Sequence, residues 1–361
     1  MDADKHAQIK AHARAIAALL YEETDPEQVQ TLSGIEEVVR GHILEHVSPE
    51  IGKFFIQTSS GTRAGRKRTL NSILGKLSLS EKQAHVLMVK PYTRWSPYLE
   101  KCCLLLSANA SYNNSAEDIK VLTGMSVSHS TQQRLVHRQD FELPELEQTV
   151  EEMSVDGGKV RLRTAIGEPC QWRDYKAVNL HEHSVGAFFC ENVNLVSWVN
   201  QQPLATPLIC LGDGHDGIWN IFAEIGTTSQ RCEILDWYHL IENLGKVGGS
   251  QQRLDAVETC LWFGDVDGAI EQFKDWQHER VKNFIIYLNK HRHRIVNYGY
   301  YQAEGISIGS GSMLLWSRYA NESTVKQVGR RIKISGAQWD ESNVPQVLKH
   351  RCAYLNGQFS I

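Results

Sequence analysis

Two acidic residues each follow a strand-like run of residues. Asp156 follows residues 153–155, and Asp213 follows residues 208–211. The interval between the acids accommodates two further strands and a connection, so the two carboxylates can meet on neighbouring strands. Two carboxylates held close together repel each other unless a cation lies between them. Mg²⁺ resolves that conflict, and two ions about 3.5–4 Å apart can activate a nucleophile and stabilise the leaving oxygen of a phosphoryl transfer.

A second interpretation of these acids is structural. Each acid precedes a glycine, and an Asp-Gly pair by itself favours a turn. A further motif supports the chemical interpretation, because Asp236 and His239 stand three positions apart where a predicted strand gives way to a predicted helix. Residues three apart on a helix share one face. The pair can therefore act together.

In this order, the motifs resemble the DDE transposases of bacterial insertion sequences. The closest resemblance is to the ISKra group, which is related to Mutator-type elements. Four motifs carry it: Ser154-Val155-Asp156-Gly157-Gly158, Gly212-Asp213-Gly214, the Asp236 and His239 pair, and the ending Ser307 to Phe359. The resemblance covers residues 150–361 strongly and the N-terminal part loosely. It implies an α/β fold with an RNase H-like mixed sheet that is flanked by helices and interrupted by a helical insertion.

The resemblance also implies a metal site. Asp156, Asp213 and a glutamate would be the catalytic residues and would bind two Mg²⁺ ions, for which Mn²⁺ could substitute. Asp236 and His239 would form an accessory pair near the metals. No other cofactor is implied.

The glutamate is the point at which this sequence departs from the family. The family motif runs Ser-Gly-x-x-Glu, but here nine residues, Met313 to Asn321, stand between Ser312 and Glu322, where one is expected. Glu322 is the best match because everything after it aligns, whereas Leu314, at the motif spacing, cannot bind a metal. Glu304 is a distant substitute. If the insertion displaces Glu322, the site lacks its third ligand and this copy is inactive.

The patterns between residues 151 and 305 predict the frame that positions these residues. Three strand-like segments come first, with a turn expected at Gly157-Gly158 and with residues 187–199 continuing the strands. Strand and helix then alternate up to residue 247, and a charge-rich helical insertion is expected at about 245–305. This order indicates a mixed sheet covered by helices.

An all-α region with a helix-turn-helix is predicted before the sheet. Residues 1–55 have helical periodicity, and the Ser/Gly-rich residues 57–72 indicate a basic linker. Residues 115–139 predict two helices, the first capped by Ser115, joined by a turn at residues 123–125. The exposed face of the second helix would carry polar side chains suited to DNA, namely Gln132, Gln133, Arg134 and His137. An ordinary helical hairpin is the alternative.

A second basic segment lies near the C-terminus. Residues 278–352 contain twelve Lys and Arg against five Asp and Glu, although the whole chain has a formal charge of −4. This excess predicts contact with DNA phosphates, and the alternative is a solvated helical surface. The residues expected to face DNA here are Lys326, Arg330, Arg331 and Lys333.

Length and composition predict a globular protein of two or three domains. The chain has 361 residues, of which 42% are hydrophobic and 22% charged. It contains neither an apolar run of the ~20 residues that cross a bilayer nor a signal-peptide pattern, so we expect a cytoplasmic protein without membrane contact. The expected divisions are a helical region with a basic linker (1–95), a helix-turn-helix region (96–148) and a catalytic domain (149–361).

The function expected from these features is DNA transposition. The enzyme would cut and join insertion-sequence ends by two-metal phosphoryl transfer. Its partners would be double-stranded DNA, as terminal repeats and as target, and further copies of itself in an oligomer on DNA. Two alternatives remain: a catalytically decayed copy that only binds DNA, and a metal-dependent nuclease that cleaves without joining strands.

Overall fold

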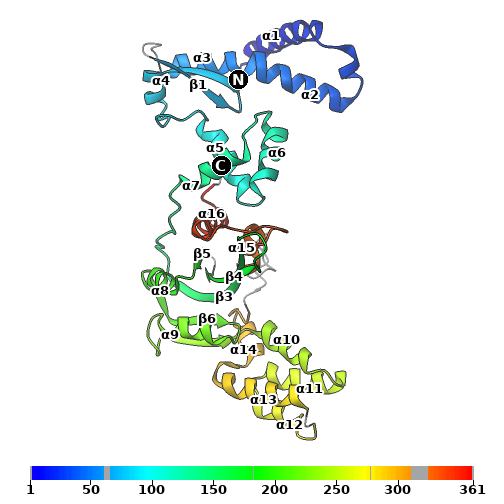
Figure 1. Cartoon of the computed structure of the whole chain (residues 1–361), viewed down its shortest axis with the longest axis vertical. Coiled ribbons are helices and arrows are strands. Elements are labelled where there is room, and N and C mark those ends of the chain that lie inside the picture. Colours follow the sequence, from blue (N-terminus) through cyan, green and yellow to red (C-terminus); the bar gives the residue numbers. More distant parts are fainter. Residues whose placement is uncertain (1, 61–65, 182, 277, 310–323, 360–361) are drawn as a thin grey trace. The chain divides into compact units, whose positions relative to one another are not determined.

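The computed structural model describes residues 2–60, 66–181, 183–276, 278–309 and 324–359. The chain divides into two compact units, Met1–Arg138 and Gln139–Ile361. Figure 1 shows the units in blue to cyan and in green to red. In the described part of the chain, no helix is both long enough and apolar enough to cross a membrane.

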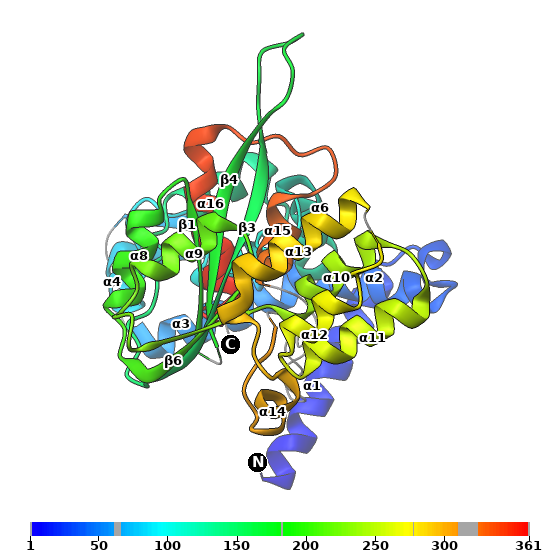
Figure 2. The ribbon, with the colours of Figure 1, turned by 90° about the horizontal axis from the view of Figure 1, so that it is seen from below.

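The second unit is built on a mixed five-stranded sheet, ordered β5-β4-β3-β6-β7. β4 lies antiparallel to both β3 and β5, whereas β6 lies parallel to both β3 and β7. Figure 2 shows the long β3 and β4 strands side by side. The predicted mixed sheet flanked by helices is therefore confirmed. The strands are β3 (Val150–Leu162), β4 (Gln171–Leu180), β5 (Ser184–Phe189), β6 (Leu204–Gly212) and β7 (Arg231–Leu235).

Both faces of this sheet are apolar, because successive side chains of a strand point to opposite faces and both faces are covered. On one face, Val155 and Val178 pack with helices α8 (Asn192–Asn200) and α9 (Asp216–Ala223). On the other face, Val160, Leu162, Tyr175 and Ala177 pack with α15 and α16. These two C-terminal helices are α15 (Thr324–Ile332) and α16 (Val344–Leu355).

The turn predicted at Gly157-Gly158 was wrong, because β3 runs straight through both glycines. Gly158 pairs with Tyr175 on β4, and a Cβ atom added at Gly158 would lie 2.3 Å from Cζ of the Tyr175 ring. The buried Tyr175 ring occupies the place of a side chain at position 158. Glycine is therefore needed here for space rather than for a turn.

We predict that Gly158→Ala lowers the free energy of unfolding by about 1–3 kcal/mol, the usual cost of overpacking a core. Denaturant unfolding followed by circular dichroism measures this change. Gly245→Ala is the matched control, because Gly245 lies in a helix with no atom within 4 Å of the added Cβ. The control should gain about 0.5–1 kcal/mol. Equal stability of Gly158→Ala and the parent would contradict this account of the strand.

The strand predicted across residues 187–199 was also wrong beyond residue 189. β5 ends at Phe189, and α8 begins at Asn192. Leu195, Trp198 and Val199 are buried in the core of the sheet, and their spacing of three and four residues is helical. Burial of this helical stripe outweighed the β-rich composition of the segment.

A run of helices separates β7 from the C-terminal pair, where the insertion at about 245–305 was predicted. After α14 (Tyr298–Ala303) the chain returns to the junction that follows β7, where the Ile308 carbonyl accepts a hydrogen bond from the Trp237 amide at the start of α10 (2.9 Å). The helices share the apolar core of the sheet through Phe284 and Tyr298. They are α10 (Trp237–Val247), α11 (Gln251–Trp262), α12 (Val266–Glu271), α13 (Glu279–His291), η3 (Arg292–Arg294) and α14 (Tyr298–Ala303).

The first unit is mostly helical but contains a β-hairpin, so the prediction of an all-α region was wrong. The residues assigned to the end of a linker form strand β1 (Lys67–Ser72), which pairs antiparallel with β2 (Gly75–Ser80). Leu70, Leu77 and Leu79 are buried, and that burial stabilises the hairpin. The helices before it are α1 (Ala3–Glu22), η1 (Pro26–Val29), α2 (Leu32–His42), η2 (Ile43–Val47) and α3 (Ser48–Ser60), and α4 (Glu81–Val86) follows it.

Three helices with a common core end the first unit. They are α5 (Pro97–Ser107), α6 (Tyr112–Thr123) and α7 (His129–His137). Gly124 ends α6 in the left-handed conformation (φ 72°). Ser111 caps α6, in place of the predicted Ser115. Ser115 lies inside the helix and donates a buried hydrogen bond to Gln132 of α7 (2.5 Å), which ties the two helices together.

Candidate active site

Three aspartates meet where three neighbouring strands pass the same level of the sheet. Val155 of β3 pairs with Gly212 of β6, and Gly212 pairs with Leu235 of β7. The residues that follow these three partners are Asp156, Asp213 and Asp236. The sheet therefore brings together the two acids predicted as metal ligands and the acid of the accessory pair.

Asp156 differs from the other two because its strand does not end there. β6 and β7 end immediately before Asp213 and Asp236, whereas β3 continues to Leu162. Asp156 therefore lies within β3, where it pairs with Ala177 of the antiparallel neighbour β4. The amide of Gly157 donates a hydrogen bond to Oδ1 of Asp156 (2.6 Å).

The charges of the three acids act on one another. Burial raises the pKa of Asp156 above its ordinary value, and the negative charges of Asp213 and Asp236 raise it further. A cation among these carboxylates would relieve the repulsion, and carboxylate oxygens are ligands that Mg²⁺ prefers. Asp156 and Asp213 thus supply two carboxylates of the kind that a divalent cation binds. Within the described ranges, however, no three His, Cys, Asp or Glu side chains are grouped so that they could hold a metal by themselves.

Asp236 and His239 form a contact at the start of α10. Asp236 is almost fully buried (1% exposed) and caps the helix, its Oδ1 accepting a hydrogen bond from the His239 amide (3.0 Å). Nδ1 of His239 lies 3.3 Å from the same oxygen. The hydrogen bond to Asp236 raises the pKa of His239, burial opposes the change, and the charges of Asp156 and Asp213 reinforce it. The carboxylates therefore favour the protonated form of the His239 imidazole.

Tyr287 of α13 reaches the loop that carries Asp213. Gly214 in that loop has a positive φ (79°), and a Cβ atom added there would lie 2.7 Å from the Tyr287 hydroxyl oxygen. Burial raises the pKa of Tyr287 to about 12, and the charges of Asp213 and Asp236 add to the shift. Sequence analysis did not single out this tyrosine. The aromatic spacing of residues 262–287 was the only available signal, and it indicates a core as readily as a site.

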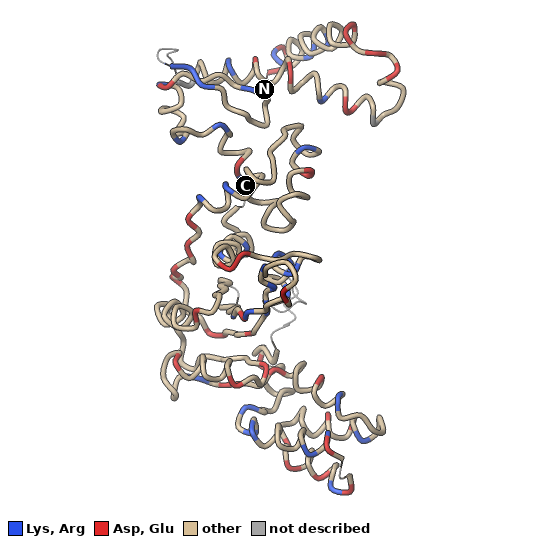
Figure 3. Tube along the Cα trace, viewed as in Figure 1, with Lys and Arg blue, Asp and Glu red and all other residues tan. Residues whose placement is uncertain are grey.

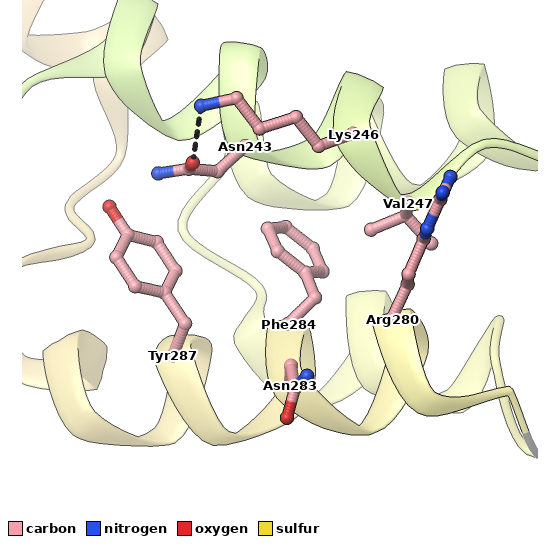
Figure 4. A pocket seen from close by; sticks show the side chains of 7 residues that line it. All are labelled: Asn243, Lys246, Val247, Arg280, Asn283, Phe284 and Tyr287. Carbon is pink, nitrogen blue, oxygen red and sulfur yellow. Dashed lines mark hydrogen bonds between the residues drawn. The ribbon is translucent and has the colours of Figure 1, made fainter.

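A groove between α10 and α13 begins at Tyr287. Figure 4 shows its side chains, which belong to these two helices, and its volume is about 560 Å³. Nζ of Lys246 donates a hydrogen bond to Oδ1 of Asn243 (3.1 Å). Arg280 adds a cation at the other helix, whereas the charge of Lys246 is paired with Glu242 (2.9 Å). The lining residues of the groove are Asn243, Lys246, Val247, Arg280, Asn283, Phe284 and Tyr287.

The segment that returns from the helices lies against Asp236 and β3. The Ser307 amide donates a hydrogen bond to Oε1 of Glu152 (3.2 Å), and a Cβ atom added at Gly309 would lie 3.3 Å from Oδ1 of Asp236. Burial acts to raise the pKa of Glu152, but hydrogen bonds from His181 and Ser307 outweigh it and lower the pKa. Glu152 therefore anchors the start of the Ser307 motif as a carboxylate. No sequence pattern pointed to it.

Glu322 and the stretch Met313 to Asn321 lie outside the described residues. The described chain resumes at Thr324, the first residue of α15. The Val325 carbonyl accepts a hydrogen bond from the Tyr175 hydroxyl (3.4 Å), and burial and the charge of Asp156 both raise the pKa of that tyrosine. The first turn of α15 therefore packs on the part of the sheet that carries Asp156.

The predicted DNA contacts on α15 divide into exposed and buried residues. Lys326, Arg330 and Lys333 are exposed. Arg331 is only 1% exposed, and its guanidinium lies over the Trp339 ring, 4.9 Å from the centroid. The assignment of Arg331 to DNA phosphates was therefore wrong, because the buried face of the amphipathic helix includes this position.

The predicted reading face on α7 requires one correction. Gln133 and Arg134 are exposed, as is His137. Gln132 is fully buried because it holds Ser115 of α6. Of the four predicted residues, those at 133, 134 and 137 are therefore available to a ligand.

No protein-family model matches the sequence, and no curated protein is significantly similar to it.

Proposed function

We propose that this chain is a DDE transposase that cuts and joins the ends of an insertion sequence by two-metal phosphoryl transfer. The observation that carries the proposal is the meeting of Asp156, Asp213 and Asp236 on three neighbouring strands. Acids gathered in this way repel one another, so the arrangement is costly unless it binds a cation. Carboxylate-held Mg²⁺ is the usual means of catalysing phosphoryl transfer at such a site.

The fold supports the same proposal. The strands β3, β4 and β5 are antiparallel, and β6 and β7 are added in parallel beside β3. This is the arrangement expected of an RNase H-like sheet. Helices between β7 and α15 fit the insertion expected in this family. The acids lie on β3, after β6 and after β7, in the order in which the family motifs occur.

The roles of the protein's own groups follow from the geometry. Asp156, Asp213 and Glu322 would hold the two metal ions, which supply charge neutralisation at phosphorus and an activated oxygen nucleophile. His239, oriented by Asp236, would donate a hydrogen bond to a phosphate oxygen at the acids. The Tyr287 hydroxyl is protonated at neutral pH, its pKa being raised still further above neutrality, and it can donate to the same substrate.

Exposed polar and basic side chains in both units would contact the DNA. Figure 3 shows Lys and Arg on α15, where Lys326, Arg330 and Lys333 are exposed. Cations of this kind contribute sequence-independent affinity for phosphates. Gln133 and Arg134 on the second helix of the α6–α7 pair have side chains suited to base edges. Double-stranded DNA is thus the proposed partner, bound by a homo-oligomer.

The test uses the full chain, Mg²⁺ and labelled duplexes that contain the DNA flanking its coding sequence. We expect cleavage at the element ends and covalent joining of the freed 3′ end to a second DNA, with Mn²⁺ able to replace Mg²⁺. Cleavage without joining would identify a nuclease instead. A gel shift without cleavage in either metal would identify a decayed, DNA-binding copy. Either of these two outcomes would overturn the proposal.

A further inference from the structure

A second site lies in the first unit, in a cleft beside the β-hairpin. The cleft has a volume of about 1360 Å³ and lies between β1, α4 and the segment 88–94. Its lining includes five Lys or Arg residues and one acid, Glu81. We call it the hairpin cleft, and its cations are Arg66, Lys67, Arg68, Lys90 and Arg94. Figure 3 shows the positive residues along β1.

The cations of the hairpin cleft divide into one structural residue and four available ones. Arg68 donates hydrogen bonds to the carbonyls of Val89 and Lys90 (3.0 Å each), which fastens the segment 88–94 to β1. Within the described ranges of the chain, no acid forms an ion pair with the other four, and all four are exposed. Uncompensated charges held around one cleft attract a polyanion.

The rim of the hairpin cleft carries a fully exposed aromatic ring. Tyr92 has a relative exposure of 102%, and Met88 beside it has 87%. Both residues have a positive φ, 59° for Tyr92 and 51° for Met88. Such backbone costs of order 1 kcal/mol for a residue other than glycine, and it persists where surrounding contacts impose it. Here the hydrogen bonds from Arg68 fix the backbone of residues 89 and 90, close to Tyr92 in the chain. The Tyr92 ring is therefore exposed to solvent at a cleft lined by cations.

We infer that the hairpin cleft binds single-stranded nucleic acid. Cations that follow a backbone, together with an exposed ring on which a base can stack, are the two elements of single-strand recognition. In a duplex the faces of the bases are stacked on one another, so the Tyr92 ring would have no partner. An acidic peptide would satisfy the cations but would leave the ring unused.

Arg66, Lys90 and Arg94 would contact phosphates, and Tyr92 would stack on an unpaired base. This function goes beyond transposition and does not depend on it, because the cleft lies in the first unit and the proposed active site in the second. It also needs no metal. Binding can therefore be measured in EDTA, where cleavage does not occur.

The experiment measures fluorescence anisotropy of the full chain with labelled oligonucleotides of about 12 nucleotides, a length within the usual site size. The probes are oligo(dT), oligo(rU) and a duplex of equal length. We expect both single strands to bind in EDTA, whereas the duplex reports on the separate DNA contacts proposed for α7 and α15. A preference for dT or rU would identify DNA or RNA as the source of the ligand, and equal binding would indicate recognition shared by both. Absence of binding to both single strands would overturn the inference, as would an equal loss of duplex and single-strand affinity when the cleft cations are replaced.

Two variants separate the phosphate contacts from the stacking contact. Arg66→Gln/Lys90→Gln/Arg94→Gln should reduce the slope of log K against log salt by about 2, since each phosphate contact to a single strand contributes about 0.7. Tyr92→Ala should weaken binding about 5-fold or more and leave the slope unchanged, whereas Tyr92→Phe should bind like the parent.

The matched control is Lys5→Gln/Lys10→Gln/Arg14→Gln, which removes the same charge from exposed positions of α1. It should retain the salt slope of the parent. The inference fails if this control loses as much slope as the cleft variant, or if Tyr92→Ala binds oligo(dT) as tightly as the parent. Circular dichroism of each variant confirms that it is folded, so that a loss of binding reports on the cleft.

Discussion

Asp156→Asn should reduce Mg²⁺-dependent cleavage by more than about 100-fold while leaving the protein folded. Mutation of a residue that contacts a metal ligand commonly lowers metal affinity or activity by about 10–100-fold. Mutation of a direct ligand should therefore lower activity by more. Asparagine keeps the size of the side chain and its hydrogen bond from Gly157, but it removes the ligand charge. The measurements are cleavage of the labelled DNA end and calorimetric titration with Mn²⁺, in which affinity should fall in parallel.

Glu151→Gln is the control for this variant, because Glu151 lies on the same strand but is exposed. It should cleave DNA and bind Mn²⁺ like the parent. Wild-type cleavage by a folded Asp156→Asn protein would remove Asp156 from the site and with it the proposed chemistry. Loss of Mn²⁺ affinity with retained cleavage would likewise contradict the assignment, since it would uncouple the metal from the reaction.

Glu322→Gln should cause a loss of the same size, and this variant decides whether the stretch Met313 to Asn321 is tolerated. Two carboxylates at Asp156 and Asp213 leave Mg²⁺ without the third protein ligand that the family motif supplies. The ion requires near-octahedral coordination at about 2.0–2.1 Å, so a glutamate held elsewhere would not replace it. Cleavage and strand joining are measured beside Mn²⁺ titration, as for Asp156→Asn.

Glu304→Gln provides the comparison, because Glu304 is the other glutamate before the C-terminal helices that sequence spacing allows. It directly follows α14 and is exposed, and its replacement should leave cleavage unchanged. Loss of activity in Glu304→Gln with full activity in Glu322→Gln would reassign the third ligand. Full activity in both variants would show that neither glutamate is needed.

Several features of the candidate site could be predicted because they depend on short-range patterns. Strand-like runs before Asp156 and Asp213 predicted acids on neighbouring strands, and the register of β3 with β6 brings them together. The junction at Asp236 was also visible, because a residue that ends a strand and caps a helix leaves a local signature. Errors arose where two local patterns competed. Gly157-Gly158 is typical of a turn, yet the strand continues because the Tyr175 ring fills the space beside it.

The sequence by itself determined the alternation of strand and helix from β6 to α10, the acids on the sheet and the basic character of residues 326–333. The tertiary structure alone decided which positive and aromatic residues serve the core and which are available to a ligand. Arg331 is buried under Trp339, whereas Tyr287 comes from a helix far along the chain to meet the Asp213 loop. The physical reason is that periodicity depends on neighbours within a turn or two. Burial and charge coupling depend on which distant segments pack together.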